Sequence, residues 1–182
     1  KINKFLRKKK KIFLKENKFY KDKFNSVSDL INEKIYTSRQ KKNLLPTHYN
    51  PRSKNITFFT VSDDEHQSFG KEFNPPFLTN QKKIVEKICK MIEKKDDYYL
   101  WIRMHPRGSG VLWSESEFYH SLEKKYKNVS LIFPDSKISS YALMYNSHKV
   151  ICYWSLLIPE TAFWRSIKPI SFVNSDFTEI GI

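Results

Sequence analysis

The chain has 182 residues, enough for one ordinary domain with an appendage, and 40% of them are apolar, which excludes a wholly disordered protein. Residues 1–54 hold 17 Lys/Arg and 4 Asp/Glu, so nearly all of the formal net charge of +14 lies there. The basic start lacks the apolar core of a signal peptide. The longest apolar-looking run, 150–164, is interrupted and is shorter than the roughly 20 residues of a bilayer span. We therefore expect a cytoplasmic protein.

Residues 1–55 are predicted to form a basic helical leader followed by a linker. Apolar residues between Val27 and Leu45 recur at an irregular amphipathic spacing, which predicts a helix. The stretch "LPTHYNPRSKN" carries two prolines and small polar residues, which is typical of a linker, here ending near Asn55. The run "RKKKK" is either a solvated tail or a contact to an anionic surface such as the inner membrane. Because the rest of the chain is nearly neutral, we do not expect a nucleic-acid partner.

From residue 56 onward, short apolar runs alternate with amphipathic segments. The apolar runs lack strict alternation, as strands buried on both faces do. Alternating strands and helices predict an α/β, Rossmann-like three-layer sandwich over 56–182, with a mostly parallel sheet of about five strands. The predicted strands are 56–61, 98–104, 129–133, 149–154 and 169–173, and the predicted helices are 80–95, 114–126, 139–146 and 159–166.

The two cysteines, Cys89 and Cys152, lie far apart in apolar surroundings without metal-ligand spacing. We expect reduced thiols in the core.

The segment "LWIRMHPRGSG" delivers Arg103, His105, Pro106 and Arg107 at the end of a predicted strand. In open parallel sheets, ligands bind beyond the carboxyl ends of the strands. Arginine offers a planar fork for phosphate, and the following glycines allow close approach of the backbone. The pattern therefore predicts phosphate binding. The structural alternative is a salt-bridged arginine and a histidine satisfied within the turn.

The acidic cluster "SDDEHQ" follows the first predicted strand. Adjacent residues on an extended or turning chain point in different directions, so all four charged or histidine side chains cannot converge on one ion. We predict no metal here. We interpret Asp64 as a ligand contact and Glu65 as a catalytic candidate beside His105, with a solvated acidic loop as the alternative.

Two further strand ends carry hydroxyl groups before a helix. Ser139 and Ser140 precede a short helix, where either can cap the first turn or contact a ligand, and the two roles are compatible. Ser155 leaves the fourth strand, and Glu160 lies in the first turn of the next helix. Glu160 either accepts hydrogen bonds from a ribose or complements the helix dipole.

The order of "FFTVSDDE", "LWIRMHPR", "PDSKISSYALM", "KVICYWSLLIPETAFW" and "KPISFV" over residues 56–175 resembles the carboxyl-terminal half of capsule polysaccharide biosynthesis proteins. These are GT-B-type glycosyltransferases of bacterial surface carbohydrates. The resemblance implies that Arg103 and His105 lie at the nucleotide phosphate, that Glu160 binds the ribose, and that Ser139, Ser140 and Ser155 match the family's serines. It implies donor binding without an obligatory metal or cofactor. The acceptor and the usual catalytic base belong to an amino-terminal half, so we expect this chain to be part of a longer enzyme.

We therefore expect a glycosyltransferase domain that takes a CMP-, UDP- or GDP-linked sugar and serves a glycan or lipid-linked acceptor. A sugar-nucleotide epimerase of the same architecture is one alternative, which turns over its substrate without an acceptor. A non-catalytic module that binds anionic surfaces through residues 1–54 is another, and it requires steeply salt-dependent binding.

Overall fold

The computed structural model describes residues 39–61, 80–105, 113–153, 155, 157–165 and 169–172. These residues belong to one compact unit that begins at Arg39. None of the helices in this part of the chain is long and apolar enough to cross a membrane.

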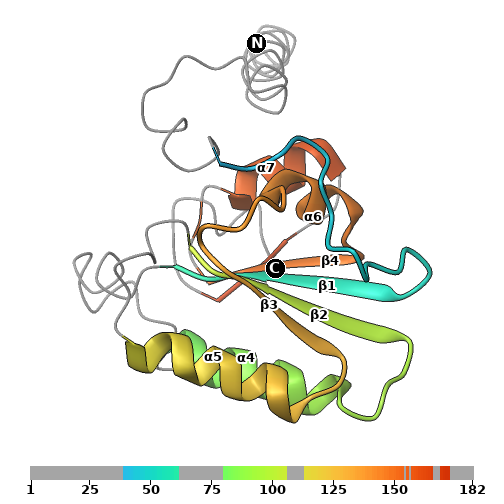
Figure 1. Ribbon diagram of the computed structural model, residues 1–182. Coiled ribbons are helices and arrows are strands. Elements are labelled where there is room, and N and C mark those ends of the chain that lie inside the picture. Colours follow the sequence, from blue (N-terminus) through green and yellow to red (C-terminus); the bar gives the residue numbers. More distant parts are fainter. Residues whose placement is uncertain are drawn as a thin grey trace, which may run out of the picture. The chain divides into compact units, whose positions relative to one another are not determined.

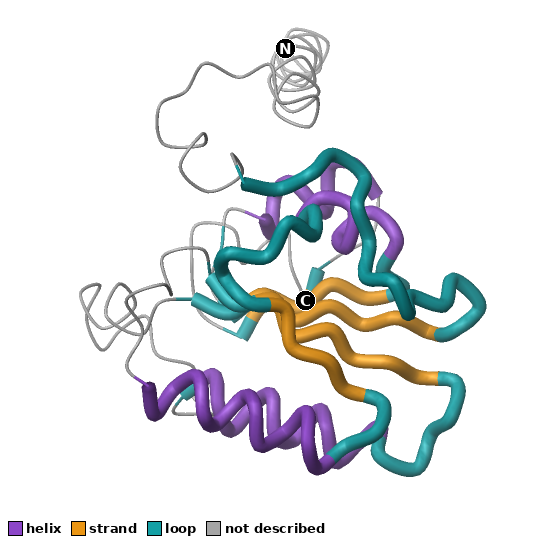
Figure 2. Tube along the Cα trace, in the orientation of Figure 1, coloured by secondary structure: helices purple, strands orange, loops and turns teal. Residues whose placement is uncertain are grey.

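The core of the unit is a five-stranded sheet in which every pair of neighbouring strands is parallel. Figure 2 shows strands of this sheet side by side, with helices on either side. The order across the sheet is β3-β2-β1-β4-β5, so the sheet grows outward in both directions from β1. This confirms the predicted α/β sandwich. The strands are β1 (Lys54–Phe59), β2 (Tyr98–Arg103), β3 (Val129–Ile132), β4 (Lys149–Cys152) and β5 (Ile170–Ser171).

Helices cover both faces of the sheet, as Figure 1 shows. Two helices, α4 (Gln81–Ile92) and α5 (Trp113–Lys125), pack on one face, and α6 (Ser140–Asn146) and α7 (Leu157–Arg165) lie on the other. The predicted helix 80–95 ends three residues early. Helix α7 begins two residues before its predicted start, and Pro159 lies in its first turn, where the missing N–H costs no intrahelical bond.

The helix predicted up to Leu45 is wrong for residues 39–45, which form turns. The backbone N–H of Leu44 donates to the carbonyl of Lys41, and Asn43 has a φ of 60°. A residue in this left-handed region ends a right-handed helix, and asparagine tolerates it better than most. The remainder of the predicted leader, residues 1–38, lies outside the described residues.

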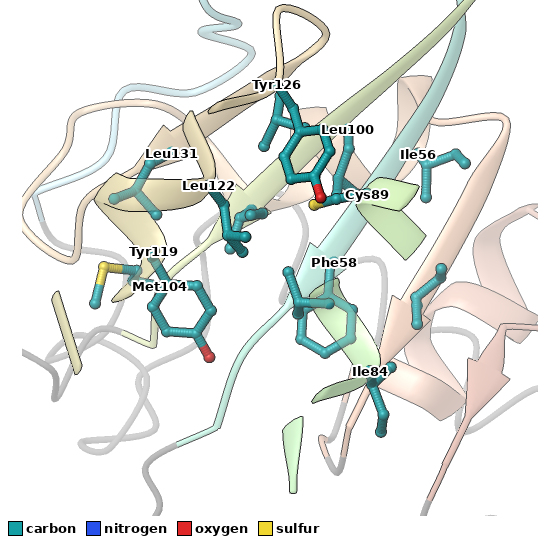
Figure 3. Packing of buried hydrophobic residues seen from close by; sticks show 14 of the residues in the cluster. Ile56, Phe58, Ile84, Cys89, Leu100, Met104, Tyr119, Leu122, Tyr126 and Leu131 are labelled. Atoms are coloured by element: carbon teal, nitrogen blue, oxygen red, sulfur yellow. The ribbon is translucent and has the colours of Figure 1, made fainter. Parts of the chain in front are cut away.

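The face toward α4 and α5 carries an apolar core that explains the unalternating strands. Phe58 and Leu100, from the two central strands, are fully buried against Ile84 and Cys89 of α4 and Tyr119 of α5 (Figure 3). Burial of such side chains contributes about 1.5–3 kcal/mol each. The central strands are apolar on this side because a helix layer excludes water from it.

The opposite face of β2 and β3 is covered by residues 39–53, a segment that we call the strap. The His48 ring lies 4.9 Å from the Trp101 ring, and Tyr49 stacks on the same indole at 5.7 Å. The Tyr49 hydroxyl donates to the carbonyl of Asn146 in α6 at 2.7 Å. The segment interpreted as a linker is thus packed on the sheet, ahead of the expected boundary at residue 55.

Polar residues of the strands match this covering. The indole N–H of Trp101 donates to Asn55 Oδ1 at 2.8 Å, and the Asn55 amide donates to the Asn50 carbonyl at 2.8 Å. Ser130 Oγ lies 3.0 Å from His48 Nε2 and 2.7 Å from the Tyr99 hydroxyl. An irregular segment brings backbone polar groups that need partners, so the strands beneath it carry side chains that supply them.

Both cysteines are free and buried, which confirms their predicted place in the core. Burial raises the pKa of the Cys89 thiol to about 12, and burial followed by the nearby Glu160 carboxylate raises that of Cys152 further. Since the thiolate is the reactive form, we expect neither cysteine to react with iodoacetamide at pH 8 in the folded protein. Mass spectrometry should find both alkylated only after unfolding in guanidinium, and rapid alkylation of the native chain would contradict this packing.

Candidate functional site

The carboxyl ends of the strands form one edge, because the register aligns their last residues. Arg103 is paired with Phe59, and Phe59 with Cys152, across β2, β1 and β4. Two strand spacings separate Arg103 from Cys152, a backbone distance of about 10 Å. The order of connection reverses between β1 and β4, the position at which sheets of this type open a crevice for ligands. The predicted site residues of β2 and β4 therefore follow the same edge.

Arg103 is enclosed at this edge, with only 2% of its surface exposed. Its Nε donates to Ser140 Oγ at 3.2 Å, and its Nη1 donates to the carbonyl of Phe133, just after β3. Nη2 is buried and, within the described part of the chain, has no hydrogen-bond partner. Burial lowers the pKa of the guanidinium to about 10, with Asp135 acting in the opposite direction. The group stays charged at neutral pH.

This arrangement differs from the salt-bridged alternative, since Arg103 forms no ion pair among the described residues. The guanidinium ties the segment after β3 to the end of β2 through two of its nitrogens. Nη2 is therefore the nitrogen that remains for another acceptor. An arginine without these two bonds could instead hold an anion with two nitrogens at once. A buried neutral donor without a partner destabilises the folded state by about 1–3 kcal/mol, and a charged donor destabilises it by more. A further oxygen acceptor would satisfy Nη2, and an anionic oxygen forms the stronger bond to a guanidinium.

His105 follows two residues after Arg103 and is half-buried. Its backbone N–H donates to Thr60 Oγ1 at 2.9 Å, and the Thr60 N–H donates to the Arg103 carbonyl at 3.0 Å. Thr60 therefore continues the contact between the two strands beyond the ends of β1 and β2. The histidine is held at the edge by its backbone.

Ser139 and Ser140 have separate roles. Ser139 is the N-cap of α6, and its Oγ accepts from the Ala142 N–H at 3.1 Å, which confirms the capping interpretation for this serine. Ser140 Oγ is the acceptor for Arg103 Nε. The structure thus joins Arg103 and Ser140, which the sequence analysis placed at two different strand ends.

Replacing Ser139 with alanine is expected to lower the free energy of unfolding by about 1 kcal/mol, since a first-turn N–H of α6 loses its partner. Chemical denaturation of the variant measures this loss. Ser121→Ala, which removes an exposed hydroxyl in α5, is the control and should stay within about 0.5 kcal/mol of the parent protein. Equal stability of both variants would show that the cap contributes nothing.

Ser155 and Glu160 lie beyond β4. Ser155 Oγ accepts from the Leu157 N–H at 3.1 Å, and its carbonyl accepts from the Ile158 N–H at 3.1 Å, so this serine starts α7. Glu160 is 2% exposed, and its carboxylate contributes to the raised pKa of Cys152 at the end of β4. A carboxylate in the first turn of a helix complements the helix dipole, as the second interpretation of Glu160 expects.

Four predicted site residues lie outside the described residues: Asp64, Glu65, Pro106 and Arg107.

Two residues that no sequence motif singled out hold the carboxyl edge of the sheet in place. Gln81 is fully buried, and its amide both accepts from the Val61 N–H and donates to the Val61 carbonyl, at 3.1 and 2.9 Å. With Thr60, it fixes the chain as it leaves β1. A glutamine at the start of an amphipathic helix gives no sequence signal for such a role.

The order of the parallel strands and the helices on both faces define a Rossmann-like α/β domain. Comparison with protein-family models gives no match, and neither the curated proteins nor the solved structures give a significant one.

Proposed function

We propose that this domain binds a nucleotide-sugar donor at the carboxyl edge of its sheet, as the donor-binding half of a GT-B-type glycosyltransferase of bacterial capsule or surface polysaccharide synthesis. The reversal of strand order at β1 and β4 supports a ligand at this edge. The order of motifs described above supports the enzyme class. In this proposal the protein works in the cytoplasm, and its basic first 54 residues keep it near the anionic inner leaflet.

The observation that carries the proposal is the state of Arg103. A buried, charged guanidinium at a strand end, with one nitrogen unpaired within the described residues, calls for an anionic ligand. A phosphate oxygen of the donor supplies the acceptor, and charge-assisted bonds of this kind are about twice as strong as neutral ones.

The chemistry follows from where charge develops. As an acceptor hydroxyl attacks the anomeric carbon, the bond from that carbon to the phosphate oxygen breaks, and the nucleotide phosphate leaves with the electron pair. Arg103, His105 and the N-terminus of α7 stabilise the departing charge, and the acceptor proton passes to a general base. Glu160 binds the ribose hydroxyls in this assignment. The general base comes from an amino-terminal half, as the resemblance implies, and Glu65 is the candidate for that role within this chain.

Isothermal titration calorimetry of the full chain with CMP, UDP and GDP tests the proposal. We expect at least one nucleotide to bind and His105→Ala to weaken that binding about tenfold, the effect of one lost hydrogen bond to a charged group. His148→Ala, an exposed position just before β4 at the amino edge of the sheet, is the matched control and should bind as the parent does. Absence of binding by all three nucleotides, or equal binding by the His105 variant, would refute the proposal.

Incubation of the protein with a sugar nucleotide alone distinguishes a glycosyltransferase from an epimerase. With a sugar nucleotide alone, a glycosyltransferase leaves the sugar configuration unchanged, whereas an epimerase yields a new sugar nucleotide without any acceptor. Product analysis by NMR distinguishes these results.

A further inference from the structure

Gln40 of the strap is connected to Arg103 through one intervening residue. The backbone N–H of Ser140 donates to Gln40 Oε1 at 2.7 Å, and the hydroxyl of the same serine accepts from Arg103 Nε at 3.2 Å. Gln40 and Ser140 are 100 residues apart in the sequence, so this contact exists only because the strap is folded onto the domain. The amide of Gln40 therefore fixes the backbone that carries the partner of the guanidinium.

The Gln40 contact is one of three that the strap makes with the four residues 137–140 before and at the start of α6. The Lys41 N–H donates to the Lys137 carbonyl at 2.8 Å, and the Ser139 N–H donates to the Leu44 carbonyl at 2.9 Å. A four-residue segment held at three of its positions has little freedom to shift. The position of Ser140 thus depends on the strap as well as on the sheet.

The other end of the strap is fixed on the sheet. His48 and Tyr49 both lie on Trp101, which is two residues before Arg103 on the same face of β2. The strap consequently extends from the aromatic cover of β2 to the serine that holds Arg103. In Figure 1 it is the blue-to-teal trace that runs beside α6.

We infer that Gln40 is a positioning residue for the phosphate-binding guanidinium, and that the strap is a structural part of the ligand site. The identity of the ligand in this inference rests on the proposed function. The two hydrogen bonds that connect Gln40 to Arg103 through Ser140 do not depend on it. Removal of the Gln40 amide leaves a first-turn N–H of α6 without its acceptor. The serine hydroxyl then loses its fixed place, and Arg103 Nη2 no longer meets the ligand at the right position.

The test compares Gln40→Ala with Gln40→Glu in the full chain. The alanine variant removes the acceptor, whereas the glutamate variant keeps an oxygen at the same distance along the side chain. We expect Gln40→Ala to speed amide exchange of Ser140 about fivefold and to shift the Arg103 Nε–H NMR signal. Gln40→Glu should stay within about twofold of the parent protein.

A second readout measures the ligand. The dissociation constant of whichever of CMP, UDP and GDP binds the parent should rise about fivefold in Gln40→Ala and return to the parent value in Gln40→Glu. Thr47→Ala, an exposed strap position, is the control and should change neither readout. The free energies of unfolding of Gln40→Ala and the parent protein are compared as well. Similar values show that the change in affinity does not come from a general loss of stability.

These measurements distinguish a failure of the positioning role from a failure of the proposed function. Unchanged Ser140 exchange and an unchanged Arg103 signal in Gln40→Ala would overturn the positioning role, whatever the nucleotides do. Failure of all three nucleotides to bind the parent would refute the proposed function, while the exchange and NMR data would still decide whether Gln40 positions Arg103.

Discussion

Replacing Arg103 with methionine is expected to weaken nucleotide binding about a hundredfold. Removing one partner of a buried, hydrogen-bonded charge pair costs 2–5 kcal/mol, and a hundredfold change corresponds to the lower part of this range. The fold should survive, because methionine fills a similar volume and the unpaired buried charge is removed with the side chain. We expect the free energy of unfolding to change by less than about 2 kcal/mol. Calorimetry and chemical denaturation measure the two quantities.

Two further variants sharpen this comparison. Arg103→Lys keeps a charge but cannot hold Ser140 Oγ, the Phe133 carbonyl and a ligand in the geometry of a planar guanidinium, so it should not restore binding. Arg52→Met removes an exposed arginine of the strap at the amino end of β1 and should bind as the parent does. Parent-like affinity of Arg103→Met would mean that this guanidinium only supports the fold.

Truncating Trp101 to alanine is expected to lower the free energy of unfolding by about 3–5 kcal/mol. The indole is 1% exposed, packs in the core that faces α6 and α7, and holds both His48 and Tyr49 of the strap. Its loss also leaves Asn55 Oδ1 without a donor in a buried position. The variant should therefore release the strap as well as open a cavity, and urea denaturation measures the combined effect.

Trp101→Phe separates these contributions. It keeps an aromatic ring for the strap but removes the N–H, so we expect an intermediate loss of about 1–3 kcal/mol. Met91→Ala, 62% exposed on α4, should stay within about 0.5 kcal/mol of the parent. If Trp101→Ala were as stable as Met91→Ala, the strap could not be packed on the sheet as described.

The fold was accessible from the sequence because its strands are buried on both faces. Runs such as "ITFFTV" and "YYLWIRM" lack the alternation of half-exposed strands, and the helix between them carries one apolar stripe. Regular elements of this kind leave a periodic signal. The parallel order and the shared edge follow from connectivity rules that hold for most such sheets.

The strap was not accessible in the same way. Its prolines and small polar residues have the composition of a linker, and the contacts of His48 and Tyr49 with Trp101 are long-range and specific to the folded chain. One unused signal lies in the strands: Ser130 is a polar position in an otherwise apolar run, and Asn55 directly precedes one, yet both are buried. Polar residues on a buried sheet face indicate a cover that is not an apolar helix face.

The candidate site was predicted in part. Arg103 was singled out as a phosphate contact, but its burial, its bond to Ser140 and its unpaired Nη2 depend on how the segment after β3 returns over the sheet. Thr60, Gln81 and Gln40 act through their backbone partners rather than through a motif. The partners of such residues are distant in the sequence, so no motif or regular spacing identifies them.

Amide hydrogen exchange of the full chain, with and without saturating UDP, CMP or GDP, tests most directly whether the carboxyl edge of this sheet holds a nucleotide. The account predicts slower exchange in 103–105, 139–142 and 155–160 with at least one nucleotide, and unchanged exchange at the amino edge, in 53–56, 97–100 and 147–150. Protection confined to the amino edge, or no protection anywhere, would contradict it.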